Sequence, residues 1–546
     1  MTGKTRGADI VARALDGAGY RTVFTLSGNH IMPVFDAAVG TRLKLIHVRH
    51  EAAAVHMADA WARLTGDCGI ALVTGGAGHT NAVAALCTAQ AADAPLVLLS
   101  GHAGTNELGR GAFQELRQAD MAEPVTKASW TASSIETLGH DIAKAVRIAK
   151  SGRPGPVHVS LPVDLLEGAI TESASLVPEA TAFAPQVCDL DPAAADAALD
   201  ALAGASRPLI LAGPMLCRGG GAELLRRLAR ATGVPALGME SPRGINDPRL
   251  GAFAEVLARA DLILLLGKPH DFTIRFADPP FVDPHCRFVA IDPDPRLIAR
   301  VAREKGERLV HGAVADAAPA AETLTKRASG VGRTTDWAGE VAEAIDYRPA
   351  AWATHASQSP AKVHPLELCR AVQPVLERNK DAVLVCDGGE IGQWPQAVLA
   401  PSRRVINGVS GSIGASIPFA IAARLAEPKA PVIAVMGDGT FGFHMAEFDT
   451  AVRCGLPFVA VVGNDATWNA EYQIQMRSYG RERTHGCELL PARYDQVAAA
   501  LGGHGEYVTT AAGLEPALER AIASGKPACV NVMIERVPAP VIRRPA

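Results

Sequence analysis

The chain of 546 residues is long enough for roughly three to four domains at about 150 residues each. Hydrophobic residues make up 48% and charged residues 20% of the sequence, which excludes a disordered or fibrous protein. The formal net charge is only −4 and there is no long basic run, so neither nucleic acid nor a membrane surface is an expected partner. Small-molecule substrates are the expected ligands.

The first twenty residues lack the apolar core of a signal peptide, and their pattern predicts an amphipathic helix. No apolar run approaches the length of a membrane span. The ten cysteines are scattered without a CxxC pair, so a zinc site is not expected. These features predict a cytoplasmic protein.

The first predicted domain, residues 1–175, alternates apolar strand patterns with helical patterns. This alternation predicts an α/β fold with a parallel, doubly wound sheet. The predicted strands are residues 22–26, 43–47, 69–74, 96–100 and 156–160.

Two further α/β domains are predicted after a linker rich in Ala, Pro and Thr at residues 171–192. The central domain, residues 193–326, has predicted strands at 208–211, 262–266 and 288–291. A second linker with some helix is expected at 326–360. The third domain, residues 361–546, begins with a helix near Val363 and a strand at 382–386. The prediction is therefore three Rossmann-like domains with doubly wound parallel sheets.

The stretch 431–469 contains two short apolar runs, 432–436 and 458–462, joined by a helical segment. This pattern predicts two parallel strands that end at the same sheet edge, where open α/β sheets bind ligands. Asp438 and Asp465 follow these strands and can face each other there.

Two carboxylates beside glycine turns are typical ligands of Mg²⁺, which usually also binds water and substrate phosphates. The small residues Gly437, Gly439 and Thr440 let a phosphate approach the backbone. An ordinary turn is the alternative, because Asp and Gly often end strands without binding anything.

Gly-Asp-Gly followed at this distance by Asn464-Asp465 resembles the diphosphate and magnesium motif of thiamine diphosphate (ThDP) enzymes. This family includes acetolactate synthase, benzaldehyde lyase and 2-hydroxyacyl-CoA lyase. The resemblance implies three metal ligands: the side chains of Asp438 and Asp465 and the backbone carbonyl of Thr467. Asp465 stands where the family usually has a second Asn.

Glu51 follows an apolar strand pattern and opens the helical pattern EAAAVHMADAWARLTG. Taken alone, a Glu in the first helical turn simply suits the helix dipole. The family resemblance implies instead the catalytic glutamate that hydrogen-bonds N1′ of the aminopyrimidine ring and so activates C2 of the cofactor. That role needs a carboxyl group protonated for part of the cycle, which the neighbouring alanines at 52–54 favour by providing an apolar setting.

The sequence TGGAGHTN resembles the family's glycine turn beside the pyrimidine ring, which implies that Gly76 and Asn81 bind the cofactor. An ordinary tight turn is the alternative. His30 matches by position an active-site histidine of benzaldehyde-lyase-like members, and Gln114 matches the Phe-Gln-Glu segment of acetolactate-synthase-like members. Both are therefore candidate catalytic residues. His79 is a lesser candidate to line the pocket.

Two loops of the third domain complete the expected cofactor site. In DGGEIG, the turn containing Gly389, Glu390 and Ile391 is expected to bind the diphosphate through backbone N–H groups. In GVSGSIG, which contains Gly411, Ile413 takes the family's place for a large apolar residue beneath the cofactor. A core isoleucine would be buried in the same way.

The resemblance implies a ThDP- and Mg²⁺-dependent enzyme that makes or breaks C–C bonds. The expected activity is that of an acetolactate-synthase-like carboligase or decarboxylase acting on a 2-oxo acid such as pyruvate. The first alternative is a benzaldehyde lyase or 2-hydroxyacyl-CoA lyase that cleaves a 2-hydroxy ketone or a 2-hydroxyacyl thioester. An NAD-linked dehydrogenase and a catalytically silent ThDP-fold binding protein are the further alternatives.

The central segment GKPHDFTIRFADPP looks closer to 2-hydroxyacyl-CoA lyases than to the FAD-binding segment of acetolactate synthases. The central domain also lacks a GxGxxG fingerprint, so an FAD cofactor is doubtful. The resemblance further implies a homodimer or homotetramer with the active site at the subunit interface. In that arrangement Glu51 and Asp438 come from different chains.

Overall fold

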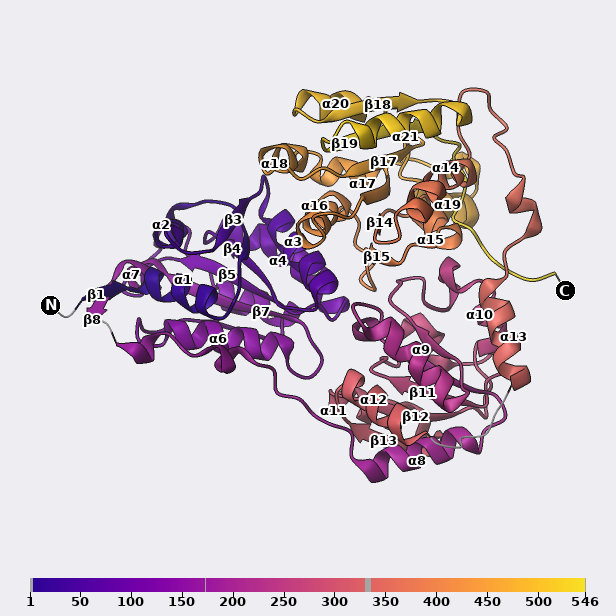
Figure 1. Ribbon diagram of the computed structural model, residues 1–546, viewed down its shortest axis with the longest axis horizontal. Coiled ribbons are helices and arrows are strands. Elements are labelled where there is room, and N and C mark those ends of the chain that lie inside the picture. The colour runs from indigo at the N-terminus through magenta and orange to yellow at the C-terminus, as the bar shows by residue number, and fades with distance from the viewer. Residues whose placement is uncertain (1–2, 172, 329–334, 546) are drawn as a thin grey trace. The chain divides into compact units, whose positions relative to one another are not determined.

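The computed structural model describes residues 3–171, 173–328 and 335–545. The chain divides into two compact units, unit 1 (Met1–Gln186) and unit 2 (Val187–Ala546). Both units are built from parallel sheets covered by helices (Figure 1). Within the described ranges, no helix combines the length and apolar character that crossing a bilayer requires.

Unit 1 contains a six-stranded sheet of order β3-β2-β4-β5-β7-β6 in which every paired strand is parallel. A short antiparallel pair, β1 (Lys4–Arg6) and β8 (Ala169–Thr171), lies outside it. The strands of the main sheet are β2 (Thr22–Thr25), β3 (Lys44–His47), β4 (Gly69–Val73), β5 (Leu96–His102), β6 (Ala128–Thr131) and β7 (Pro156–Pro162).

Helices cover both faces of this sheet. Helix α1 packs on α6, and α3 packs on α4 (Figure 1). Because β4, β5 and β7 lie between helical layers, every residue in them is buried, as expected of parallel strands. The helices are α1 (Gly7–Gly17), α2 (Met32–Ala38), α3 (Glu51–Thr65), α4 (Ala77–Ala91), α5 (Gln118–Ala122), α6 (Leu138–Lys150) and α7 (Val163–Glu167).

Unit 2 contains two parallel sheets. The central sheet has the order β10-β9-β11-β12-β13 and the C-terminal sheet the order β15-β14-β16-β17-β19-β18. The central strands are β9 (Pro208–Ala212), β10 (Ala236–Gly238), β11 (Leu262–Leu266), β12 (Arg287–Asp292) and β13 (Leu309–Val314). The C-terminal strands are β14 (Val383–Cys386), β15 (Arg403–Ile406), β16 (Val432–Gly437), β17 (Val459–Asn464), β18 (His504–Val508) and β19 (Ala528–Met533).

The helices of unit 2 follow the strands in alternation, as predicted for an α/β fold. Those before residue 350 are α8 (Pro192–Ala203), α9 (Gly221–Thr232), α10 (Phe253–Leu257), α11 (Pro295–Lys305), α12 (Ala317–Arg327) and α13 (Thr335–Asp346). The later ones are α14 (Pro365–Arg378), α15 (Gln393–Val398), α16 (Ser416–Ala426), α17 (Asp438–His444), α18 (Glu447–Arg453), α19 (Asn469–Tyr479), α20 (Tyr494–Ala500) and α21 (Leu514–Ala523).

The stretch 431–469 has the predicted arrangement. Strands β16 and β17 pair in parallel, so they end at the same edge of the sheet. Two short helices, α17 and α18, connect them instead of the single helix expected. Each of the other predicted strands is also confirmed, with ends displaced by at most two residues.

Both predicted linkers are partly wrong, because segments of each pack into a core. In the second linker, α13 buries Trp337 and Val341 in the central core, and Trp337 Nε1 donates to Pro208 O at 2.9 Å. In the first linker, Phe183 is buried with its ring centroid 6.2 Å from that of Tyr20. Residues 172 and 329–334 of these linkers lie outside the described residues. The three domain boundaries remain a prediction, although each predicted domain contains one main sheet.

The packing of α13 predicts that Trp337→Ala destabilises unit 2. The variant loses a buried indole and leaves the Pro208 carbonyl without its donor, so we expect a loss of about 3–5 kcal/mol. Chemical denaturation followed by far-UV circular dichroism measures this loss. The control is Asp336→Ala, which alters an exposed neighbour on the same helix. Equal stability of the two variants would show that α13 is a linker helix after all.

Candidate functional site

A cavity of about 310 Å³ lies in unit 2, where β14, β16 and β17 end. Loops that are far apart in the sequence form its wall. All the site residues predicted in the third domain line this one cavity: Gly389, Glu390, Ile391, Gly411, Ile413, Gly437, Asp438, Gly439, Thr440, Asp465 and Thr467. Residues of motifs that are far apart in the sequence therefore lie around one cavity in the structure.

Asp438 and Asp465 are both buried in this cavity, with exposed fractions of 2% and 6%. Burial raises the pKa of Asp438 to about 6. The pKa of Asp465 is raised to about 7 by burial and by the nearby charge of Asp438. In addition, Asp438 Oδ2 has no hydrogen-bond partner among the residues that the structure describes. A buried pair of carboxylates with an unpartnered oxygen fits a divalent cation, which would neutralise both charges.

The donor set around this pair suits a hard cation. It comprises two carboxylates and the buried residue Thr467, whose backbone carbonyl is the third predicted ligand. Within the described parts of the chain, no group of three or more His, Cys, Asp or Glu side chains is arranged to hold a metal. The protein thus offers an incomplete oxygen shell, which is the usual form of a Mg²⁺ site completed by phosphates and water.

Asp387, which sequence reasoning missed, fixes two walls of the cavity. Its Oδ2 accepts hydrogen bonds from the backbone N–H groups of Gly414 and Ser416, each at 3.0 Å. Its Oδ1 accepts from Gly388 N at 2.6 Å. Burial raises the pKa of Asp387 to about 6. One carboxylate therefore holds both the glycine turn after β14 and the loop that contains Ile413.

Trp468 is a second lining residue that sequence reasoning did not single out. A Cβ atom at position 439 would lie 2.5 Å from the Trp468 ring, so only glycine fits there. At Gly388, φ is +107°, a conformation that other residues rarely adopt. The glycines thus let the backbone come close to the cavity while the indole closes one side.

The Glu390 side chain, which lines the cavity, contacts groups from two other segments. Its Oε1 lies 3.7 Å from Arg243 Nη2, and its Oε2 accepts a hydrogen bond from the backbone of Ala539. Arg243 belongs to the central part of unit 2 and Ala539 to its C-terminal tail. The Glu390 carboxylate thus links three segments of unit 2. The predicted contact of residue 390 with a diphosphate would therefore be made by its backbone N–H group.

In unit 1, Glu51 is the first residue of α3 and its exposed fraction is 8%. Asn81, on α4, donates a hydrogen bond from Nδ2 to Glu51 Oε2 at 3.0 Å. A Cβ atom at position 78 would lie 3.2 Å from Glu51 Oε1 and 2.7 Å from the Thr74 side chain. The glycine turn predicted from the sequence therefore packs directly against the carboxyl group.

The other candidate residues of unit 1 gather on the same turn. His30 Nδ1 lies 3.3 Å from Thr74 Oγ1, and burial, with a smaller effect of His102, lowers the pKa of His30. A Cβ atom at position 76 would lie 2.7 Å from the Cβ of Gln114. His30, Gly76 and Gln114 are thus neighbours, as their predicted roles require.

His79 does not line a pocket, in contrast to the expectation. It is fully buried, its Nδ1 lies 2.9 Å from Ser100 Oγ, and its ring centroid is 4.5 Å from that of His158. Burial lowers the pKa of His79 to about 4, so the imidazole is neutral. It faces the core because α4 turns this position towards the sheet.

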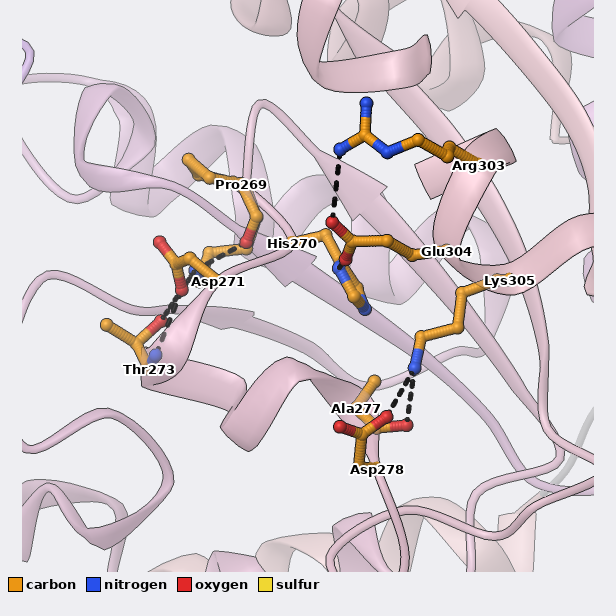
Figure 2. Close-up of polar contacts among 10 residues, drawn as sticks. Pro269, His270, Asp271, Thr273, Ala277, Asp278, Arg303, Glu304 and Lys305 are labelled. Atoms are coloured by element: carbon orange, nitrogen blue, oxygen red, sulfur yellow. Dashed lines mark hydrogen bonds and ion pairs between the residues drawn. The ribbon is translucent and has the colours of Figure 1, made fainter. Parts of the chain in front are cut away.

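The central segment that bears on FAD, residues 267–280, makes ion pairs within itself and with Lys305 of α11 (Figure 2). Lys268 Nζ donates to Asp271 Oδ1 at 3.0 Å, and Lys305 Nζ donates to Asp278 Oδ1 at 2.8 Å. Between these ion pairs, residues 275–277 all adopt positive φ. The ion pairs thus stabilise an unusual backbone conformation.

A second cleft of about 870 Å³ adjoins the first cavity and shares Pro242, Arg243, Glu390 and Gln393 with it. Its walls combine exposed aromatic rings with arginines. Further lining residues include Phe272, Arg275, Phe281, Arg477 and Arg543.

Three family models match the chain in order. The thiamine pyrophosphate enzyme N-terminal TPP binding domain matches residues 5–121, the central domain 195–324, and the C-terminal TPP binding domain 387–532. Similar proteins cover nearly the whole chain. The acetolactate synthase large subunit of Mycobacterium tuberculosis is 34% identical over 96% of this chain and 95% of its own length.

The chain belongs to the thiamine pyrophosphate (ThDP) enzyme family. This ThDP enzyme is also similar to 2-hydroxyacyl-CoA lyase 2 of Homo sapiens, 31% identical over 91% of this chain and 84% of the relative. A catabolic acetolactate synthase of Raoultella terrigena is 29% identical over 97% and 95%. The protein is thus an enzyme of carboligase or lyase type. The NAD-linked dehydrogenase and the catalytically silent protein are wrong alternatives.

The buried carboxylate pair predicts that Asp438→Ala abolishes Mg²⁺-dependent binding of ThDP, because the variant removes an oxygen ligand close to the diphosphate. Asp465→Asn should be mild, since an amide oxygen can still bind the metal. Calorimetric titration with ThDP in Mg²⁺ measures both. The control is Asp381→Ala, an exposed carboxylate ahead of β14. Unchanged affinity in Asp438→Ala would rule out the metal assignment.

Proposed function

We propose that this ThDP enzyme requires Mg²⁺ and is an acetolactate-synthase-like carboligase or decarboxylase acting on a 2-oxo acid such as pyruvate. The observation that carries the proposal is the cavity in which Asp438 and Asp465 are buried together beside glycine turns. The similarity to two acetolactate synthases over more than nine-tenths of the chain supports the choice of substrate class.

When bound, ThDP supplies a nucleophilic carbon that attacks a carbonyl group and accepts the electrons of the broken C–C bond. In unit 2, Asp438, Asp465 and Thr467 would hold Mg²⁺ against the diphosphate. Asp387 keeps the loops around them in place. Ile413, in one of these loops, would support the cofactor rings from below.

In unit 1, Glu51 would hold a proton at N1′ of the aminopyrimidine ring. Asn81 occupies Oε2 of this carboxyl group, so Oε1 is the oxygen left to share that proton. Burial at the start of α3 keeps water away from the exchange. His30, whose lowered pKa makes it neutral near pH 7, would hydrogen-bond the reacting substrate oxygen, with Gln114 beside it.

A lyase acting on a 2-hydroxyacyl thioester is the second candidate function. The cleft of about 870 Å³ favours it, because pyruvate has no group that would reach a space of this size beside the cofactor cavity. Arg243, Arg275 and Arg477 would compensate the phosphates of a long thioester carrier. Similarity to the human 2-hydroxyacyl-CoA lyase 2 points the same way.

One assay separates the two candidates. The protein is reconstituted with ThDP and Mg²⁺ and incubated either with pyruvate or with a 2-hydroxyacyl-CoA, and products are identified by mass spectrometry. Acetolactate from pyruvate supports the proposed function. An aldehyde and formyl-CoA from the thioester, without acetolactate, would replace it by the lyase function.

The Glu51 assignment predicts that Glu51→Gln lowers turnover by at least about 10²-fold, the scale of lost acid–base catalysis. Folding and ThDP affinity should stay nearly unchanged, because Gln fills the same space and still accepts from Asn81. The measurement is C2 proton exchange of bound ThDP by NMR. Glu136→Gln, an exposed substitution in unit 1, is the control. Near-normal exchange in Glu51→Gln would refute the role.

We also propose a cytoplasmic homodimer or homotetramer in which unit 1 of one chain and unit 2 of its partner complete each site. The family resemblance supports this assembly, since Glu51 and Asp438 belong to different units.

This assembly predicts complementation between two inactive variants. Mixing Glu51→Gln with Asp438→Ala chains under exchanging conditions should restore about a quarter of the sites, because half of randomly formed dimers are mixed and each has one intact site. Activity after proven subunit exchange is the measurement. No recovery would show that each site is formed within one chain.

A further inference from the structure

Gln118, the first residue of α5, is a buried side chain without a role in the proposed function, and its exposed fraction is 1%. Its Oε1 accepts a hydrogen bond from Gly76 N at 2.8 Å. Its Nε2 donates to Gly101 O at 3.1 Å and to Ser160 Oγ at 3.0 Å. A single amide thus joins the glycine turn before α4 to the ends of β5 and β7.

The orientation of this amide is fixed by the backbone. The N–H group of Gly76 faces Oε1 of Gln118, and the carbonyl group of Gly101 faces Nε2. A flipped amide would therefore lose both hydrogen bonds. Ser160 Oγ lies 3.4 Å from Nε2 of His158, whose Nδ1 lies 2.8 Å from Ser129 Oγ. Burial keeps the pKa of His158 well below its usual value, so the imidazole beside Ser160 is neutral.

The glycine turn depends on its hydrogen bond to Gln118 because it has few side chains of its own. Gly76 adopts φ +59° and ψ −114°, which suits glycine alone. A Cβ atom at position 75 would lie 2.8 Å from Gly101 O and 3.1 Å from Gln118 Oε1. The turn is therefore pressed against Gln118 and held by one hydrogen bond to it.

Gln118 also ends the loop 113–118, which lies across the same turn. Phe113 stacks on His30 with ring centroids 6.0 Å apart, and Gln114 contacts Gly76. His102 Nε2 donates to Leu116 O at 2.9 Å. Phe113 is 68% exposed, whereas Gln118 is buried, so Gln118 anchors the C-terminal end of this loop.

We propose that Gln118 is a positioning residue for the pyrimidine half of the site. By holding Gly76 it sets the start of α4, and through α4 the hydrogen bond between Asn81 and Glu51. By ending the loop it also sets the place of Gln114. The link to Glu51 chemistry rests on the proposed function, whereas the hold on the turn does not.

The test compares Gln118→Met, which keeps the size of the side chain and loses all three hydrogen bonds, with Ser160→Ala. The latter removes only the Ser160 partner and leaves the bonds to Gly76 and Gly101. In the protein without cofactor, hydrogen–deuterium exchange of the peptide covering residues 74–81 should become about tenfold faster in Gln118→Met, the scale of one lost buried hydrogen bond. In Ser160→Ala it should match the wild type.

With ThDP and Mg²⁺ added, C2 proton exchange in Gln118→Met should fall at least about tenfold, because the Asn81–Glu51 pair is displaced. The dissociation constant of ThDP should change by less than about threefold, since the proposed metal and diphosphate contacts lie in unit 2. Gln118→Glu serves as the second variant if Gln118→Met fails to fold. It retains an acceptor for Gly76 but places an oxygen against Gly101 O, so its C2 exchange should also fall.

Equal effects of Gln118→Met and Ser160→Ala, or unchanged exchange of residues 74–81 in Gln118→Met, would overturn the proposal. Faster amide exchange without any loss of C2 exchange would also overturn it, because the turn would then move without affecting Glu51. Absence of ThDP binding to the wild type would instead contradict the proposed function. The amide-exchange comparison would still decide whether Gln118 holds the turn.

Discussion

The main electrostatic constraint on the cavity of unit 2 is a pair of buried like charges. Asp438 and Asp465 follow adjacent parallel strands, so the topology of the sheet places both carboxylates at one edge and removes them from water. Burial raises the pKa of both carboxyl groups, and the charge of Asp438 raises that of Asp465 further. Among the described residues, Asp438 Oδ2 has no hydrogen-bond partner. A divalent cation would offset this electrostatic cost. The hydrogen bonds of Asp387 hold the glycine turns beside this pair, where their backbone would bind phosphate close to such a cation.

The buried carboxyl group of unit 1, Glu51, has different neighbours. Glu51 faces an amide, Asn81, and no cation contacts it among the hydrogen bonds and ion pairs of the described residues. Such a setting suits a group that exchanges a proton, whereas the setting of Asp438 suits a permanent ligand. In both units, glycine turns follow the strands β4 and β16, and in the proposed function they would leave room for the cofactor. Buried side chains outside the expected motifs, Gln118 and Asp387, hold these turns.

The sequence predicts those features that depend on local pattern. Buried parallel strands such as β11 are continuous apolar runs, and the Glu51 and Asp438 motifs follow strands directly. Strands β6 and β13 at sheet edges were missed because they lack such runs: β6 is half-buried, and β13 alternates between partly buried and exposed residues. The edge strand β3 was nevertheless predicted, and the interior strand β19 was missed although all its residues are buried. Gln118 and Asp387 were missed because their partners are backbone groups far away in the sequence. Arg243 approaches Glu390 only through tertiary packing, which no local pattern records.

We propose that a metal ion joins the carboxylate pair to the cofactor. Calorimetric titration of the wild-type protein with ThDP, in Mg²⁺ and again in EDTA, measures this dependence. We expect removal of Mg²⁺ to weaken ThDP binding at least about tenfold, or about 1.4 kcal/mol. Equal affinity with and without the metal would contradict it.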